Sequence, residues 1–492
     1  MRSVSPWFAF PVLEEEMSIT IVGLGPGEPR HLTREAWELL SAAEEVWLRT
    51  ARHPTVNGLP SHLILHAFDE LYETAEDFAA VYRAIAAEVL RLGRRSDGVI
   101  YAVPGHPLVG ESTVQQVLAG AREAGLPVRI VQGLSFVEPT LTALGLDALE
   151  GLQVNDGIEL AAYHHPPINP DLPALIGQVY SRRLASDLKL TLMNQYPDDY
   201  PVALVHGAGT ATERVVHLPL YELDRREVDH LTTLYIPPLP SVSSFEGLQE
   251  TVAHLRGPDG CPWDREQTHE SLRGGLLEEA YETVAAIDAG DIAGLREELG
   301  DLLLQIVLQT QIATEGGDFR MADVIAGIDA KLKRRHPHVW GDRVVEGERE
   351  LLLQWEHLKG EEKGENSSLL DGVPKALPAL LQAHIYGERV ARVGFDWPGP
   401  AGVAEKVLEE IAELETAATL EEVEAELGDL LFAVANWARH LGVDPEGALR
   451  QANERFARRF GALEELARRR GLELERMTIE EMDALWEEVK VE

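Results

Sequence analysis

The sequence predicts a multidomain protein in which an N-terminal α/β domain is followed by an all-α region of two similar helical units. Three observations support this fold class. Short β-branched segments alternate with helical periodicity from Ser18 to about Pro237. Strand patterns almost vanish from Phe245 onward, and four motifs recur in the same order within the helical half. At roughly 150 residues per domain, the 492 residues suffice for about three domains.

Alternating strand and helix patterns predict the α/β domain. Four segments have strand patterns, at residues 19–23, 98–103, 128–132 and 202–205. Helical periodicity lies between them, for example at residues 75–92 and 112–124. This alternation is typical of βαβ units and of a mostly parallel sheet. We therefore expect an α/β domain over residues 18–237, preceded by an extension of residues 1–17 that lacks the pattern of a signal peptide.

The helical half follows a break rich in proline and serine at residues 236–244, which predicts a linker. The first carboxylate motif, Glu-Glu-Ala-Tyr-Glu at residues 278–282, recurs as Glu-Glu-Ile-Ala-Glu at residues 409–413. The second, Glu-Leu-Gly-Asp at residues 298–301, recurs at residues 426–429. We expect the two helical repeats to span residues 245–365 and 370–492.

The composition limits the classes of partner. Asp and Glu number 83 against 44 Lys and Arg, which gives a formal net charge of −39. Such a surface disfavours binding to duplex nucleic acid or to anionic membranes, and no segment is long and apolar enough to span a bilayer. Cys261 is the only cysteine, which excludes an intramolecular disulfide and favours a cytoplasmic location.

The carboxylate motifs predict metal sites. Residues three or four apart share one helix face, so each repeat offers two carboxylate pairs that converge if the two helices are antiparallel neighbours. Oxygen ligands suit Mg²⁺, with Mn²⁺ as a possible substitute. A solvated acidic helix face is the alternative. However, residues 299–308 are apolar nearly all round, which predicts a buried helix, and buried carboxylates need cations.

This pattern, together with residues 257–269 and 333–339, resembles the MazG family of all-α nucleoside triphosphate pyrophosphohydrolases. The resemblance covers about residues 245–492. It implies Mg²⁺-dependent hydrolysis of a nucleoside triphosphate (NTP) to a nucleoside monophosphate (NMP) and pyrophosphate, usually by a dimer, with a role in cleaning the nucleotide pool. The metal ligands that it implies are Glu279, Glu282, Glu298 and Asp301 in the first repeat, and Glu410, Glu413, Glu426 and Asp429 in the second. Glu278 and Glu409 are weaker candidates, for a supporting role or as general base.

Basic and aromatic residues are expected to complete the substrate site. The candidates for holding the triphosphate are Lys331, Arg334, Arg335 and Lys359 in the first repeat, and Arg455, Arg458, Arg459 and Lys490 in the second. Surface ion pairs are the alternative for each of them. Trp355 and Trp486 could stack on the base or fill a helical core. The family resemblance favours the second repeat as the more active one, although both retain all four acidic ligands.

The N-terminal domain carries a separate pattern. A strand runs into Gly23-Leu-Gly25-Pro-Gly27, where the absent side chains allow close approach to a ligand or a tight turn. With residues 102–109, 132–136 and 205–209, this loop resembles the tetrapyrrole methylase family over residues 18–225. That resemblance implies S-adenosylmethionine in a cleft between two α/β lobes, with contacts from Gly23, Gly25, Gly27, Pro104 and Gly105. The family motif Gly-Asp-Pro reads Gly-His-Pro here, at residues 105–107.

The order of the two resemblances is that of the YabN-type family of fusion proteins. We expect NTP pyrophosphohydrolysis as the main activity. One alternative is an S-adenosylmethionine-dependent methyltransferase with a regulatory helical half. The other is a nucleotide sensor that binds NTP without turnover. A homodimer is expected because closing each metal site needs four helices, although the two repeats of one chain could instead pair with each other.

Overall fold

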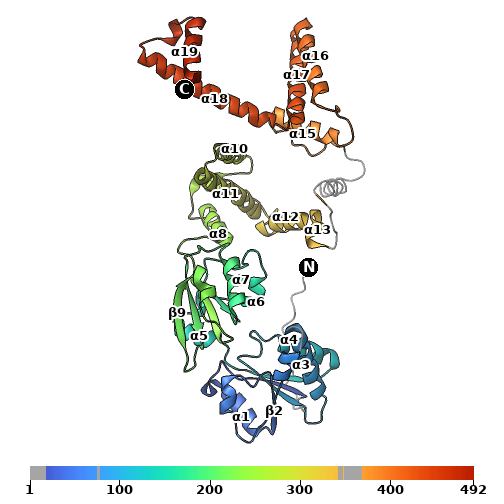
Figure 1. The fold of residues 1–492 in the computed structure, drawn as a ribbon, viewed down its shortest axis with the longest axis vertical. Coiled ribbons are helices and arrows are strands. Elements are labelled where there is room, and N and C mark those ends of the chain that lie inside the picture. The colour runs from blue at the N-terminus through green and yellow to red at the C-terminus, as the bar shows by residue number, and fades with distance from the viewer. Residues whose placement is uncertain (1–17, 75–77, 342–346, 348–367, 492) are drawn as a thin grey trace. The chain divides into compact units, whose positions relative to one another are not determined.

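The computed structural model describes residues 18–74, 78–341, 347 and 368–491. An α/β domain precedes a region in which none of the described residues lies in a strand, so the predicted fold class is confirmed (Figure 1). The chain divides into two compact units between Val324 and Ile325, within helix α12 (Met321–Arg335). No described helix is both long and apolar enough to cross a membrane.

The first sheet is entirely parallel, with strand order β3-β2-β4-β1-β5. Its strands are β1 (Ile19–Gly23), β2 (Glu45–Leu48), β3 (Ile64–Ala67), β4 (Val99–Val103) and β5 (Val128–Val131). Ile19 is in register with Val99 on one side and with Val128 on the other. The predicted strands at residues 19–23, 98–103 and 128–132 are therefore confirmed to within one residue, whereas β2 and β3 were not predicted.

Helices cover both faces of this sheet, so β1 and most of β4 are buried. Ile19 and Ile21 pack with α3 (Phe78–Leu92) and α4 (Ser112–Ala124). Val22 packs on the opposite face with α1 (Arg34–Ala42). The remaining elements of this lobe are α2 (Asp69–Thr74), η1 (Pro29–His31) and η2 (Pro54–Gly58). The helix predicted at residues 112–124 is confirmed.

The second sheet has strand order β6-β7-β10-β8-β9, and only β6 and β7 run parallel. Its strands are β6 (Gln153–Asp156), β7 (Ala174–Gly177), β8 (Pro201–His206), β9 (Arg214–Pro219) and β10 (Thr232–Ile236). The expectation of a mostly parallel sheet is therefore wrong for this lobe. A short loop with Gly207 and Gly209 at positive φ joins β8 to β9, and so short a connection allows only antiparallel pairing.

One face of the second sheet is closed by α6 (Gly157–Ala161), α7 (Arg182–Leu192) and η4 (Leu220–Arg225), whose leucines form a common core with Ile176, Leu204 and Leu234. Helix α5 (Val137–Leu144) and η3 (Ala148–Glu150) connect the two lobes along the chain. Gln178 is the one described non-glycine residue with positive φ, at +61°. Its Nε2 donates to Asp156 Oδ2 at 2.7 Å and to the carbonyl oxygen of Gly110 at 3.4 Å, so it ties the end of β7 to a loop of the first lobe.

The helical part of the first unit contains α8 (Phe245–Arg256), α9 (Pro262–Glu266), α10 (Arg273–Ala289) and α11 (Ile292–Gly316). Helices α10 and α11 form a hairpin. Gly290, with φ +66°, ends α10 in the left-handed conformation. Asp291 begins α11 by accepting hydrogen bonds from the backbone of Ala293 and Gly294. A small core around Val252 and Val307 holds α8 against α11.

The second unit repeats this hairpin in α16 (Pro400–Thr416) and α17 (Leu420–His440). Thr419 and Glu422 form a capping box at the start of α17. Helix α10 runs seven residues past Glu282, whereas α16 ends three residues past Glu413. The two carboxylate motifs are three residues closer together in the second repeat, and this difference arises at this helix end. The other elements are α13 (Pro337–Trp340), α15 (Ala379–Ala391), α18 (Pro445–Arg469), η5 (Leu474–Arg476) and α19 (Ile479–Val491).

Candidate metal centres

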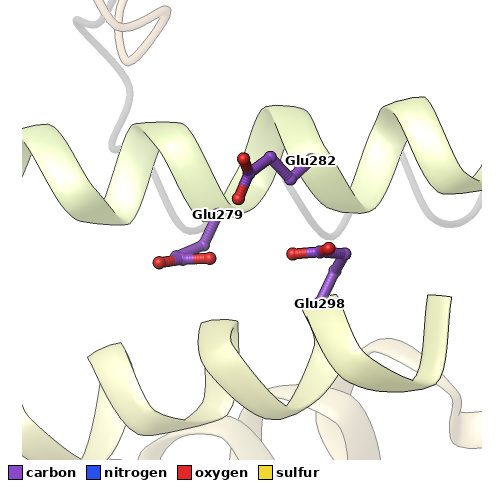
Figure 2. Close-up of side chains that lie close together, drawn as sticks. All are labelled: Glu279, Glu282 and Glu298. Carbon is purple, nitrogen blue, oxygen red and sulfur yellow. The ribbon is translucent and has the colours of Figure 1, made fainter. Parts of the chain in front are cut away.

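The helical hairpin of the first repeat brings three of its four expected ligands together. Glu279 and Glu282 lie one turn apart on α10, and Glu298 lies on the facing helix α11 (Figure 2). One carboxylate oxygen from each lies within 4.8 Å of the others. Asp301 is outside this trio, although it is close enough to act on the charge of Glu279. The arrangement offers oxygen ligands from two helices to one point.

Electrostatics in the first cluster favour a cation. Partial burial and the neighbouring carboxylates of Asp301, Glu282, Glu298 and Glu278 raise the pKa of Glu279. Partial burial and the carboxylates of Glu282, Asp301 and Glu297 likewise raise the pKa of Glu298. No basic side chain contributes to either shift. Mutual repulsion therefore destabilises the ionised cluster, and a divalent cation would relieve that repulsion.

The second repeat gathers Glu410 from α16 with Glu426 and Asp429 from α17, again within 4.8 Å. Glu410 is only 4% exposed. Glu413 is exposed and lies outside the trio. Partial burial of Glu426 raises the pKa of that residue, and the charge of Glu413 raises it further. The two repeats thus select different trios from equivalent sets of four.

Lys406 distinguishes the second cluster from the first. Its Nζ lies 2.6 Å from Glu410 Oε1 and 2.9 Å from Glu409 Oε1. The corresponding position of the first repeat, four residues before Glu279, is Gly275. Lys406 was not among the residues predicted from the sequence, although its spacing of four residues before Glu410 predicts an ion pair on a helix. One buried ligand of the second cluster therefore already has a cationic partner.

The prediction that residues 299–308 form a buried helix is wrong. Leu299, Leu303 and Ile306 on α11 are 50%, 37% and 42% exposed, whereas Val307 and Leu308 are buried. Among the described residues, α11 packs mainly against α10 and α8, with Met321 of α12 in the same small core, and these contacts cover part of its circumference. Glu298 is accordingly half-buried rather than enclosed in a core.

The other expected site residues lie apart from the trios or outside the described residues. Glu278 is exposed beside Glu279, and Glu409 pairs with Lys406. Lys331, Arg334 and Arg335 lie on α12. Arg455, Arg458 and Arg459 lie on α18, and none of these three forms an ion pair with a described carboxylate. Lys359 and Trp355 lie outside the described residues.

The last two expected substrate contacts are in α19. Trp486 packs against Phe456, with ring centroids 5.3 Å apart, in a small core that includes Leu463 and Leu485. Of the two alternatives for Trp486, this contact favours core packing over base stacking. Lys490 pairs with Glu487 at 2.5 Å, one turn earlier on the same helix.

The glycine loop of the N-terminal domain packs closely on two other loops. A Cβ atom at Gly23 would lie 2.6 Å from the carbonyl oxygen of Gly105 and 2.7 Å from the amide nitrogen of Gly133. Gly25 and Gly105 also exchange two backbone hydrogen bonds, of 3.2 and 2.8 Å. Backbone packing thus requires glycine at residue 23, whereas Gly25 and Gly105 have positive φ, which favours glycine. In the same loop, His106 Nδ1 accepts a hydrogen bond from the amide of Leu108, which agrees with a structural role for this histidine.

Polar groups that sequence analysis missed lie beside this loop. His53 and Thr55 are buried, and neither His53 Nδ1 nor Thr55 Oγ1 has a hydrogen-bond partner among the described residues. Pro54, between them, lies against Gly27. Burial, with smaller contributions from His230 and Arg49, lowers the pKa of His53 to about 4. Unpaired buried polar atoms are costly, so these two are candidates for contacts with a polar ligand.

Family models match three segments of the chain. The tetrapyrrole (corrin/porphyrin) methylase model matches residues 18–224, the MazG nucleotide pyrophosphohydrolase model residues 267–340, and the phosphoribosyl-ATP pyrophosphohydrolase model residues 383–456. The two helical repeats therefore match two different pyrophosphohydrolase models. The tetrapyrrole methylase and MazG resemblances expected from the sequence are confirmed.

Similar proteins cover either the whole chain or its helical half. The MazG nucleoside triphosphate pyrophosphohydrolase/pyrophosphatase of Thermotoga maritima is 47% identical over 50% of this chain and 95% of its own length. The nucleoside triphosphate pyrophosphohydrolase of Escherichia coli (strain K12) is 44% identical over 51% of this chain and 98% of its own. YabN of Bacillus subtilis (strain 168) is 42% identical over 96% of this chain and 98% of its own. The chain therefore belongs to the YabN family, with a tetrapyrrole methylase-type domain ahead of a MazG-type helical half.

Proposed function

We propose that this protein is a Mg²⁺-dependent nucleoside triphosphate pyrophosphohydrolase, which converts NTP and water to NMP and pyrophosphate. The observation that carries the proposal is the pair of carboxylate trios, each within 4.8 Å and each built from two facing helices. The names of the MazG relatives from Thermotoga maritima and Escherichia coli, both nucleoside triphosphate pyrophosphohydrolases, support it. We further propose that the enzyme serves to remove unwanted nucleotides from the cytoplasmic pool.

The donor set fits a hard divalent cation. Every candidate ligand atom is a carboxylate oxygen, the donor that Mg²⁺ and Mn²⁺ prefer. Glu279, Glu282 and Glu298 would hold the ion in the first repeat, and Asp301 is near enough to join them. Glu410, Glu426 and Asp429 would hold it in the second. When bound, Mg²⁺ supplies positive charge to the phosphates and acidifies the attacking water.

The chain's own residues would then position the substrate and move one proton. Water attacks the α-phosphorus, the bond to the bridging oxygen breaks, and pyrophosphate leaves. We assign Glu278 and Glu409 as candidates to accept the water proton, because each adjoins a ligand and is itself outside the trio. The basic residues of α12 and α18, with Lys359 and Lys490, are the candidates for contacts to the triphosphate.

Single carboxylate substitutions test this proposal. The purified chain is incubated with a panel of NTPs and Mg²⁺, and pyrophosphate is measured separately from orthophosphate. We expect NMP and pyrophosphate from the wild type, with a loss of 100-fold or more in Glu279→Gln or in Glu410→Gln, whichever repeat does the work. Glu250→Gln, an exposed change on α8, is the control. If the wild type binds NTP with Mg²⁺ but releases no pyrophosphate, the protein is a nucleotide sensor instead.

A second function is favoured by the N-terminal domain. We propose that S-adenosylmethionine binds at the loops of Gly27 and Gly105, and that His53 Nδ1 and Thr55 Oγ1, which have no hydrogen-bond partner among the described residues, contact it. Equilibrium dialysis of the full chain with labelled S-adenosylmethionine tests this. We expect binding that weakens about tenfold in Thr55→Val, which removes one hydroxyl at nearly constant volume. Equal binding by wild type and variant would exclude Thr55 from the site.

A further inference from the structure

A pocket of about 300 Å³ lies in the second lobe of the α/β domain and has no part in the sites described above. Alternate residues of β8 and β9 line it, so Leu204 with His206, and Arg214 with Val216, face it from the sheet. Thr232 adds the start of β10, and Arg225 and Arg226 close it from the end of η4. The pocket is therefore built from strands that the domain core holds in place.

Three arginines around one small pocket are unexpected in a chain with a net charge of −39. Arg226 pairs with Glu222. Arg225 lies over the ring of Tyr221, 5.5 Å from its centroid. Across the described residues, neither Arg225 nor Arg214 forms an ion pair with a carboxylate. Glu227 adds one negative charge to the lining, and Asp229 pairs with the lining residue His206. The positive charge that no carboxylate neutralises among the described residues is therefore that of Arg214 and Arg225. Guanidinium groups gathered in this way attract anions and match the geometry of phosphate oxygens.

The floor of the pocket is mostly apolar. Leu204 and Thr232 are buried, and Val216 is half-buried. A floor of this kind beside charged guanidinium groups suits a ligand that combines an anionic group with an apolar or planar part. The volume is at the lower end of the range of small-molecule sites, roughly 300–1,000 Å³.

We propose that this pocket binds the phosphate of a small phosphorylated molecule, of which a nucleoside monophosphate is the class that also uses the apolar floor. The phosphate accepts hydrogen bonds from Arg214 and Arg225, and the base lies against Leu204 and Val216. The anion site follows from the pocket alone, and only the choice of nucleotide and pyrophosphate as probes rests on the proposed hydrolase function. Product binding here would give the N-terminal domain a response to the activity of the helical half.

Calorimetric titration of the full chain with AMP, pyrophosphate and adenosine tests the proposal. EDTA keeps the carboxylate trios free of metal, so the result does not depend on the hydrolase proposal. We expect AMP to bind and the double variant Arg214→Ala/Arg225→Ala to weaken that binding at least tenfold, with Arg214→Lys intermediate. Arg183→Ala, an exposed arginine of the same lobe outside the pocket, should leave the affinity unchanged.

The other outcomes decide between ligands or overturn the proposal. Pyrophosphate binding as tightly as AMP, with the same dependence on Arg214, would show that the pocket recognises phosphate groups alone and would exclude a contribution from the base. Adenosine binding as tightly as AMP would overturn a phosphate site. An AMP affinity that is the same in the wild type and the double variant, or no AMP binding at all, would also overturn it. Circular dichroism of each variant checks that the fold is intact.

Discussion

At the residue scale, the two repeats differ most clearly at one position. Lys406 neutralises Glu410 in the second cluster, whereas glycine occupies the equivalent place before Glu279. Hydrogen bonds to Glu410 and Glu409 raise the pKa of Lys406, so it stays protonated at neutral pH. A metal ion bound to Glu410 therefore competes with a charge that is already present. The first cluster has no such competitor among its described neighbours.

We predict that Lys406→Met increases the affinity of the second cluster for Mn²⁺, on the order of tenfold, because it removes a positive charge beside the ligands. Titration of Mn²⁺ followed by electron paramagnetic resonance measures the affinity, with Glu279→Gln as background to remove the first site. Lys375→Met, outside the trios, is the control. Unchanged affinity would mean that Lys406 leaves Glu410 when the metal binds.

The two sets of four carboxylates were predictable from sequence because the spacing of three or four residues and the repeat fix which carboxylates share a helix face. Which three of four come together was not, because it depends on the relative rotation of the two helices. The unpaired His53 and Thr55 gave no signal, since burial of a loop residue depends on distant parts of the chain. Lys406 had a readable signal, the spacing to Glu410, that the interpretation of the acidic motif passed over.

At the element scale, the sequence was most informative for strands and helices whose own residues carry a clear pattern. Strand β1 and helix α4 begin and end at the predicted residues. Strands β6 and β7 have only four residues each, too short for a clear alternation, and β7 also pairs with the distant strand β10. The apolar circumference of α11 suggested burial, but the chain itself covers only part of that helix. Local pattern thus predicted elements well and their neighbours poorly.

Without metal, the carboxylates that α10 and α11 bring together repel one another and lower the stability of the folded chain. Partial burial and the charges of Glu282 and Asp301 raise the pKa of Glu298, so the folded chain binds more protons than the unfolded chain. Stability then falls as the pH rises above the ordinary value of 4.5. We predict that Glu298→Gln in EDTA raises Tm at pH 7, and that this gain vanishes below pH 4.5.

Thermal unfolding across this pH range, with and without Mg²⁺, tests the prediction. Added Mg²⁺ should raise Tm of the wild type at pH 7 more than that of Glu298→Gln, because binding to the folded state stabilises it. Glu250→Gln on α8 controls for the general loss of negative charge. A gain in Tm that is the same at pH 4 and pH 7 would show that repulsion within the trio is not its cause.

At the scale of the whole molecule, both helical hairpins expose large apolar side chains. Leu303 and Ile306 on α11, and Leu431 and Phe432 on α17, are all exposed. Exposed apolar side chains grouped on one helix, as on α11 and separately on α17, mark association sites. Each hairpin supplies two helices, and a second hairpin against it would complete a four-helix arrangement around the carboxylates. We therefore propose a homodimer.

We predict that the wild type sediments as a dimer at micromolar concentration and that Leu431→Glu or Leu303→Glu shifts it toward monomer. A charge placed in a buried apolar interface costs several kcal/mol, enough to change the dissociation constant by on the order of 100-fold or more. Leu149→Glu, in an exposed turn of the α/β domain, should leave sedimentation unchanged. A monomeric wild type would instead favour pairing of the two repeats within one chain. In that case Leu303→Glu and Leu431→Glu should each lower Tm without changing the sedimentation coefficient of the folded chain, because the surface they disrupt would be internal.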